Sequence, residues 1–223
     1  MAQDGGGDAR LLSVCVGRPQ LLEWRGRRVE SAIAKRPVTG PVALARDNLE
    51  GDAQADLTVH GGPWKAVYLY PSEHYGPWRG ELEDSELPHG SFGENLTSAG
   101  LDEERVSIGD VLRIGSAELQ VTQPRLPCFK LVARFRRDDM AKRMLASGRT
   151  GFYLAVRREG RVEAGDAVER IEADPRGVSV AALVGLYTRK TGDPELLERV
   201  LSVPALPDWW RAELRERGSA GLA

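Results

Sequence analysis

The chain has 223 residues, with 31 Lys and Arg against 33 Asp and Glu, and a hydrophobic fraction of 41%. Such a composition is typical of a globular protein, and the length allows one large domain, or one domain plus a small appendage. The nearly balanced charge argues against a general nucleic-acid or membrane-surface binder, and no apolar run is long enough to span a bilayer.

The N-terminus and the cysteines indicate a cytoplasmic location. Residues 1–10 are rich in Gly and Asp, so we expect them to be disordered. They lack the basic region and the apolar core of a signal peptide. The two cysteines, Cys15 and Cys128, lie in different contexts and do not suggest a disulfide framework. Reduced thiols in the cytoplasm are the expectation.

Short apolar or alternating runs separated by Gly and Pro predict a mainly β domain. The runs cover residues 11–17, 38–44, 65–70, 111–115, 117–121, 152–156, 161–163 and 168–171. The Gly115-Ser116 pair between two of these runs predicts a hairpin. We expect a barrel or sandwich over residues 11–173, with Cys15 packed inside its first strand.

Two helices are predicted within this β domain. Ser72 can cap the first, over residues 72–82, and Gly148 ends the second, over residues 131–147. The second helix is basic, and such a charge run is usually a solvated face. The repeated Gly-Asp pairs at residues 109–110 and 165–166 predict turns that precede strands.

Helical spacing after Pro175 predicts a separate C-terminal domain of three helices over residues 178–218. Asp193 and Pro194 form the start of its second helix. Its third helix contains Trp209 and Trp210. We interpret these rings as anchors that pack the helices onto the barrel, because aromatic side chains dominate such packing. Docking of a partner, or a contact in a homodimer, is the alternative.

Cys128 is the most informative candidate residue. Pro127 precedes it and holds the approach extended, and Arg125 and Lys130 flank it. Nearby positive charge favours the thiolate, which can act as a nucleophile or as a ligand for a soft metal. A small buried hydrophobe is the alternative. The local sequence leaves both interpretations open.

The other cofactor patterns are weak. Three scattered histidines and one suitable cysteine do not form a zinc site, which needs four N or S ligands, or three and a water. No Gly-rich dinucleotide fingerprint follows a predicted strand, and no cysteines are spaced for an iron–sulfur centre. Any redox activity would therefore need a separate electron donor.

Six segments, in order, resemble the MOSC-domain family, the β-rich domain shared by the C-terminal regions of molybdenum cofactor sulfurases and by amidoxime-reducing proteins. They are residues 35–42, 54–67, 90–97, 108–110, 123–131 and 148–153. The three-helix tail resembles that of one bacterial branch, which is associated with resistance to N-hydroxylated base analogues such as 6-hydroxylaminopurine. The resemblance implies a MOSC β-barrel with a few helices, followed by the small helical domain.

The resemblance also implies a molybdenum cofactor, in which the metal is held by the dithiolene of a phosphorylated pterin and by one protein thiolate. Cys128 would be that thiolate, a soft and deprotonated ligand. His60 would donate a hydrogen bond to substrate or to an oxo group, with a structural hydrogen bond as its alternative. The candidate contacts to the anionic cofactor are Arg36, Lys65, Asn95, Arg125, Lys130 and Arg149.

Two of these implications carry alternatives. Asn95 would contact the pterin or would only fasten a turn, the common role of Asn. Trp64 departs from the small or acidic residue expected at its position, and it would either shape the pocket or pack outside the barrel.

By resemblance, the chain reduces N-hydroxylated compounds at a Cys-ligated molybdenum, and its electrons come from a separate flavin or iron–sulfur reductase. The alternative is a molybdenum cofactor carrier or a sulfur-transfer module without turnover, because a cysteine can carry a persulfide. A third interpretation is a domain that keeps the fold without the chemistry. The natural substrate, the donor, the oligomeric state and the choice of molybdenum over tungsten stay open.

Overall fold

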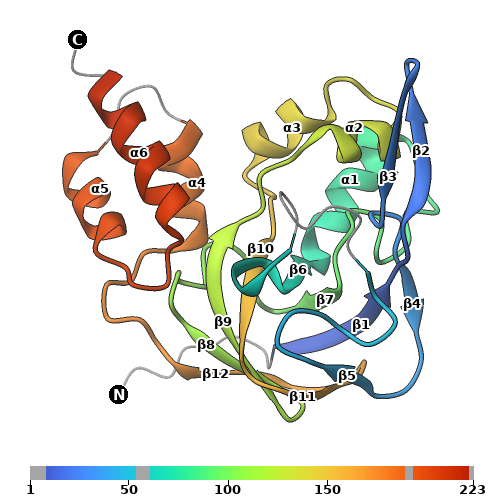
Figure 1. Cartoon of the computed structure of the whole chain (residues 1–223), viewed down its shortest axis with the longest axis horizontal. Helices are drawn as coiled ribbons and strands as arrows, with labels where there is room; N and C mark the ends of the chain where they lie inside the picture. The colour runs from blue at the N-terminus through green and yellow to red at the C-terminus, as the bar shows by residue number, and fades with distance from the viewer. Residues whose placement is uncertain (1–8, 54–60, 189–192, 221–223) are drawn as a thin grey trace.

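The computed structural model describes residues 9–53, 61–188 and 193–220. An eight-stranded sheet forms its centre (Figure 1), with the order β12-β8-β9-β10-β6-β7-β1-β4. Within this sheet only β6 and β7 pair in parallel. The strands are β1 (Arg10–Val16), β4 (Arg36–Val38), β6 (Val67–Pro71), β7 (Leu96–Ala99), β8 (Val111–Ile114), β9 (Ala117–Pro124), β10 (Phe152–Arg158) and β12 (Val168–Glu172).

The sheet curls so that β1, which lies next to the edge strand β4, approaches β12 at the opposite edge. Arg10 at the start of β1 forms a bridge to Ala167, just before β12. The Leu11 N–H donates to the Asp166 carbonyl over 2.8 Å, which strengthens this contact. The mainly β class is confirmed, whereas the predicted barrel is, over the described residues, a curled sheet and not a closed barrel.

Two small ladders flank the sheet. Strand β5 (Val42–Leu44) pairs with β11 (Gly160–Val162), so the run predicted at residues 38–44 supplies strands to two different sheets. Gly40, with φ of 79°, turns the chain between β4 and β5. The hairpin of β2 (Gln20–Trp24) and β3 (Arg27–Ser31) was not predicted, because both strands are mostly exposed and β3 is largely charged.

The helix predicted at residues 72–82 is confirmed as a 3₁₀ turn, η2 (Ser72–His74), followed by α1 (Tyr75–Leu82). The predicted cap is wrong, because Ser72 lies inside η2 and makes no capping hydrogen bond to a described residue. The single helix predicted at residues 131–147 is wrong. It forms two helices, α2 (Phe129–Phe135) and α3 (Met140–Ser147), because Arg136 adopts a left-handed conformation with φ of 52°. A non-glycine side chain gives no sequence signal for such a break.

The predicted C-terminal helices are confirmed as α4 (Val180–Thr188), α5 (Pro194–Leu201) and α6 (Asp208–Ala220). They stand together at one side of the sheet (Figure 1). Asp193 caps α5, since its carboxylate accepts from the backbone N–H of Glu195 and of Leu196. None of the described helices is long and apolar enough to cross a membrane.

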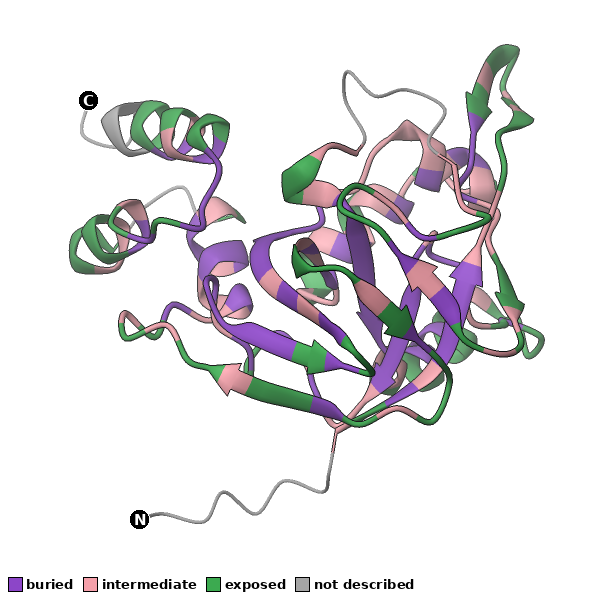
Figure 2. Ribbon diagram, turned by 60° about the horizontal axis from the view of Figure 1, so that its bottom comes forward, coloured by how far each residue is buried: buried purple, intermediate pink, exposed green. Residues whose placement is uncertain are grey.

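One apolar core joins the sheet to the C-terminal helices. It includes Leu119 of β9, Leu183 of α4 and Trp210 of α6. The Trp210 ring is fully buried, and its Nε1 donates to Gln123 Oε1 over 3.0 Å. Trp210 therefore anchors α6 to the sheet, whereas Trp209 is 43% exposed. Figure 2 shows the same contrast, with buried strands at the centre and exposed residues on the outer turns of these helices.

A second core lies between the sheet and helices α1 to α3. The rings of Tyr70 and Phe92 stack with centroids 4.5 Å apart, and the ring of Trp78 packs against Phe92. The Trp78 indole donates to the Tyr70 hydroxyl over 2.7 Å. These contacts fix the turn that contains Phe92, Gly93 and Asn95.

We expect Trp210→Leu to lower the free energy of unfolding by about 3 kcal/mol. The substitution removes a buried ring and leaves the side-chain oxygen of Gln123, Oε1, without its hydrogen-bond donor. Trp209→Leu is the matched control, and an exposed neighbour should cost less than about 1 kcal/mol. Urea unfolding followed by circular dichroism measures both. Equal losses in the two variants would contradict the anchoring role of Trp210.

Candidate functional site

A cavity of about 100 Å³ lies beside Cys128. Its lining comes from residues far apart in the chain, including the end of β9, the start of α2, the strand β6 and the turn after Pro88. Among the described residues, the polar side chains in its wall are Ser31, Lys35, Asp52, Lys65, Tyr68, Asn95, Arg125, Cys128, Lys130 and Tyr153. Four of these side chains are cationic and one is a carboxylate, so the cavity suits an anionic ligand.

Cys128 lies between a strand and a helix. Strand β9 ends at Pro124, and α2 begins at Phe129. Cys128 is extended, with φ of −128° and ψ of 176°, and its carbonyl accepts from the Leu131 N–H over 3.0 Å. The side chain is partly buried in the wall of the cavity. Its backbone is thus held while its sulfur lines the cavity.

Arg125 lies next to this thiol and is buried, with only 5% of its surface exposed. Its Nη1 donates to the sulfur of Met144 over 3.2 Å, and its guanidinium lies 5.5 Å from the Tyr68 ring. No ion pair to a carboxylate is formed by Arg125 among the described residues. A buried cation without an acidic partner favours an anion in the cavity.

Lys65 and Tyr153 face the same cavity. Burial lowers the pKa of the Lys65 ammonium, and the nearby Cys128 acts in the opposite direction. Burial raises the pKa of Tyr153, and the charge of Arg125 opposes that rise. Tyr153 is therefore a protonated phenol at neutral pH.

Lys35 is paired, unlike Arg125. Asp52 accepts from the Lys35 ammonium, from the Gly17 N–H over 2.7 Å and from the Asn95 amide over 3.0 Å. Burial lowers the pKa of Lys35, and Asp52 opposes this effect. Among the described residues of the wall, the carboxylate of Asp52 pairs with Lys35, and Lys65, Arg125 and Lys130 add further positive charge.

Asn95 is largely committed to protein partners. Its Oδ1 accepts from the Tyr68 N–H over 3.2 Å, and its Nδ2 donates to the Cys15 carbonyl over 3.3 Å and to Asp52. These bonds support the turn-fastening alternative. At neighbouring Gly93, where φ is 85°, an added Cβ would lie 2.7 Å from Ile33. A glycine is therefore required at this wall of the cavity.

The predicted site residues divide into three groups. Cys128, Lys65, Asn95, Arg125 and Lys130 line the cavity. Two predicted cations do not line it, and His60 lies outside the described residues. The roles assigned to all of these residues stay predictions.

The two cations outside the cavity have other surroundings. Arg36 is exposed on β4. Arg149 pairs with Glu81, and its guanidinium lies 4.0 Å from the centre of the Trp78 ring. Arg149 therefore packs against the second core through the ring of Trp78.

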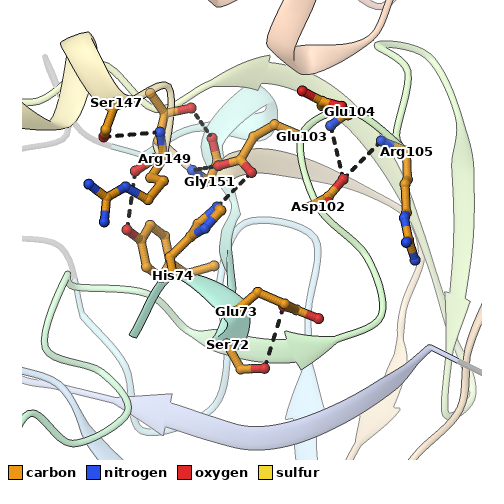
Figure 3. Close-up of polar contacts among 12 residues, drawn as sticks. Ser72, Glu73, His74, Asp102, Glu103, Glu104, Arg105, Ser147, Arg149 and Gly151 are labelled. Carbon is orange, nitrogen blue, oxygen red and sulfur yellow. Dashed lines mark hydrogen bonds and ion pairs between the residues drawn. The ribbon is translucent and has the colours of Figure 1, made fainter. Parts of the chain in front are cut away.

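Near Arg149, His74 has a structural partner. In Figure 3 its imidazole points at Glu103, with 2.7 Å between Nε2 and the carboxylate. The other oxygen of Glu103 accepts from the Gly151 N–H over 2.6 Å. Over the described ranges, no three His, Cys, Asp or Glu side chains are grouped to hold a metal. A metal at Cys128 would thus need most of its ligands from a cofactor.

Sequence reasoning did not select Lys35, Asp52, Tyr68 and Tyr153 for the site. Lys35 was one of several basic residues without a distinguishing signal. Asp52 lies in a loop, and both tyrosines lie in strands that were predicted only as sheet. Only the strand register and the path of the loop place them beside Cys128.

Two family models match the chain. The MOSC domain matches residues 56–169, and the YiiM-like, 3-alpha helix domain matches residues 178–217. The first match includes Cys128 and most of the cavity wall, and the second covers the three C-terminal helices.

Individual known proteins are also similar to this chain. The chain is 44% identical to the uncharacterized protein YflK of Bacillus subtilis, over 93% of each chain. It is 37% identical to part of a protein named reductase from Gibberella moniliformis, over 66% of this chain and 27% of that protein. The crystal structure of YiiM from Geobacillus stearothermophilus matches with a TM-score of 0.79 and 32% identity, over 94% of this chain and 99% of that one.

We expect Asp52→Ala to lower the free energy of unfolding by about 3 kcal/mol, because it leaves a buried ammonium and two other donors without their acceptor. Lys35→Met should cost a similar amount, since it leaves the buried Asp52 carboxylate without its ion-pair partner. Urea unfolding measures both, with exposed Asp47→Ala as control. An Asp52→Ala variant as stable as the control would refute this role of the carboxylate.

Proposed function

The chain belongs to the MOSC domain family, and we propose that it binds a molybdenum cofactor through Cys128 and reduces N-hydroxylated compounds, such as N-hydroxylated purines and hydroxylamines. The observation that carries the proposal is the place of Cys128 in a cavity whose described wall has more cations than carboxylates. The relative named reductase supports an oxidoreductase.

The donor set of the cavity fits such a cofactor. The chain offers one soft sulfur ligand and no further cluster of metal ligands among its described residues. A cofactor that brings a dithiolene needs only one protein thiolate, and thiolates suit soft metals. Its phosphate would be met by cations, and Lys65, Arg125 and Lys130 supply them.

The residues of the chain have separate roles in this proposal. When bound, the cofactor supplies the two-electron chemistry by which an N-hydroxyl group, with two electrons and two protons, gives an amine and water. Cys128 holds the metal at the cavity wall. Arg125 and Lys130 neutralise the anionic cofactor, and the protonated Tyr153 offers a polar wall without adding negative charge.

The electrons would come from a separate donor protein. A flavin or iron–sulfur reductase is the class we propose, since the sequence carries no fingerprint for a dinucleotide or an iron–sulfur centre.

We expect the purified protein, loaded with molybdenum cofactor, to convert 6-hydroxylaminopurine to its amine with reduced methyl viologen as electron donor. Cys128→Ala should lower the rate by more than about 100-fold, since changes beyond the metal ligands already cost 10–100-fold. Chromatography of the product measures turnover, with Cys15→Ala as control. A cofactor-loaded protein that binds but never reduces the substrate would favour the carrier alternative.

We expect Lys130→Gln to retain several-fold less molybdenum and pterin after dialysis, because it removes a cation from the cavity wall. Arg36→Gln removes the same charge from an exposed strand outside the cavity, so it is the matched control and should retain the wild-type amount. Metal analysis and pterin fluorescence measure retention. Equal retention by both variants would argue against a cofactor seated on this cavity.

A further inference from the structure

The ring of Trp209, on α6, lies against a cation of the cavity. Lys65 Nζ is 5.2 Å from the centre of the indole ring, within the range of a cation–π contact. Lys65 lines the cavity together with Cys128. Trp209 is 43% exposed, whereas Trp210 beside it is buried and already anchors α6. The Trp209 ring also lies 4.9 Å from the Trp210 ring, so it connects the buried anchor of α6 to Lys65.

Hydrogen bonds tie the backbone next to Lys65 to the same helix. Lys65 ends the short 3₁₀ turn η1 (Pro63–Lys65). The Trp64 carbonyl accepts from Thr122 Oγ1 over 2.7 Å and from Gln123 Nε2 over 3.1 Å. The amide oxygen of Gln123 in turn accepts from Trp210. One glutamine amide thus links α6 to the turn that carries Lys65.

We propose that Trp209 is a positioning residue, which holds the Lys65 ammonium at the cavity wall beside Cys128. The C-terminal helical domain then acts on a cavity whose described lining comes from the sheet, from α2 and from loops. The consequence is a stronger positive field at the sulfur of Cys128 when α6 is in place. This inference concerns the protein alone, and it holds or fails independently of the proposed cofactor.

The test compares two alkylating reagents on Cys128 in the full chain. Iodoacetate is anionic and iodoacetamide is neutral, and both react with the same thiolate. The ratio of their rates at one pH therefore reports the local charge and cancels the thiolate fraction. Mass spectrometry follows the labelling of Cys128, and Cys128→Ala gives the background from buried Cys15.

Lys65→Met should lower the iodoacetate to iodoacetamide ratio roughly threefold, the scale of one nearby charge in a watery site. Trp209→Leu should lower it in the same direction, by no more than Lys65→Met does, because the ammonium loses its contact with the indole ring. Trp209→Phe keeps an aromatic face for the cation and should keep most of the wild-type ratio. Trp209→Gln, a second exposed substitution, should behave as Trp209→Leu does.

The double variant separates positioning from general loosening. If Trp209 acts through Lys65, Trp209→Leu should change nothing further in the Lys65→Met background. An unchanged ratio in both Trp209→Leu and Trp209→Gln would overturn the proposal. An equal fall in the Lys65→Met background would overturn it as well, because the effect would then bypass Lys65.

Discussion

The buried carboxylate of Asp52 is the contact on which the cavity depends. It joins the Gly17 backbone, the Lys35 ammonium and the Asn95 amide, which come from three separate segments. A buried charge is stable only when it is paired and hydrogen-bonded, so these three segments must meet in one arrangement. Asn95 extends the arrangement to the Tyr68 backbone, and so to the strand β6 that forms another wall.

The local charge of the cavity contrasts with that of the whole chain. The sequence carries 33 acidic and 31 basic residues, so its composition alone indicates no anionic ligand. The fold brings Lys65, Arg125 and Lys130 together beside a cysteine, and Asp52, the carboxylate of the described wall, pairs with Lys35. Charges in such a concave site act more strongly than the same charges on an open surface.

Local patterns predicted much of this fold, because Gly and Pro mark turns, and apolar spacing distinguishes strands from helices. Local sequence also identified Cys128 as a candidate site residue, because Arg125 and Lys130 lie close to it in the chain. Contacts between distant segments were not predicted. Nothing local shows that Asp52 reaches Lys35, that Arg36 does not line the cavity, or that Arg136 breaks a helix. Side-chain direction depends on strand register, which is a property of the whole sheet.

The most direct test of the account is the molybdenum and pterin content of protein purified from a host that makes the cofactor. Wild type and Cys15→Ala should carry nearly one molybdenum and one pterin per chain, and Cys128→Ala should have lost or loosened both. A folded wild-type protein without either component, or a Cys128→Ala variant that keeps both as tightly as wild type, would contradict the assignment of Cys128 as the ligand.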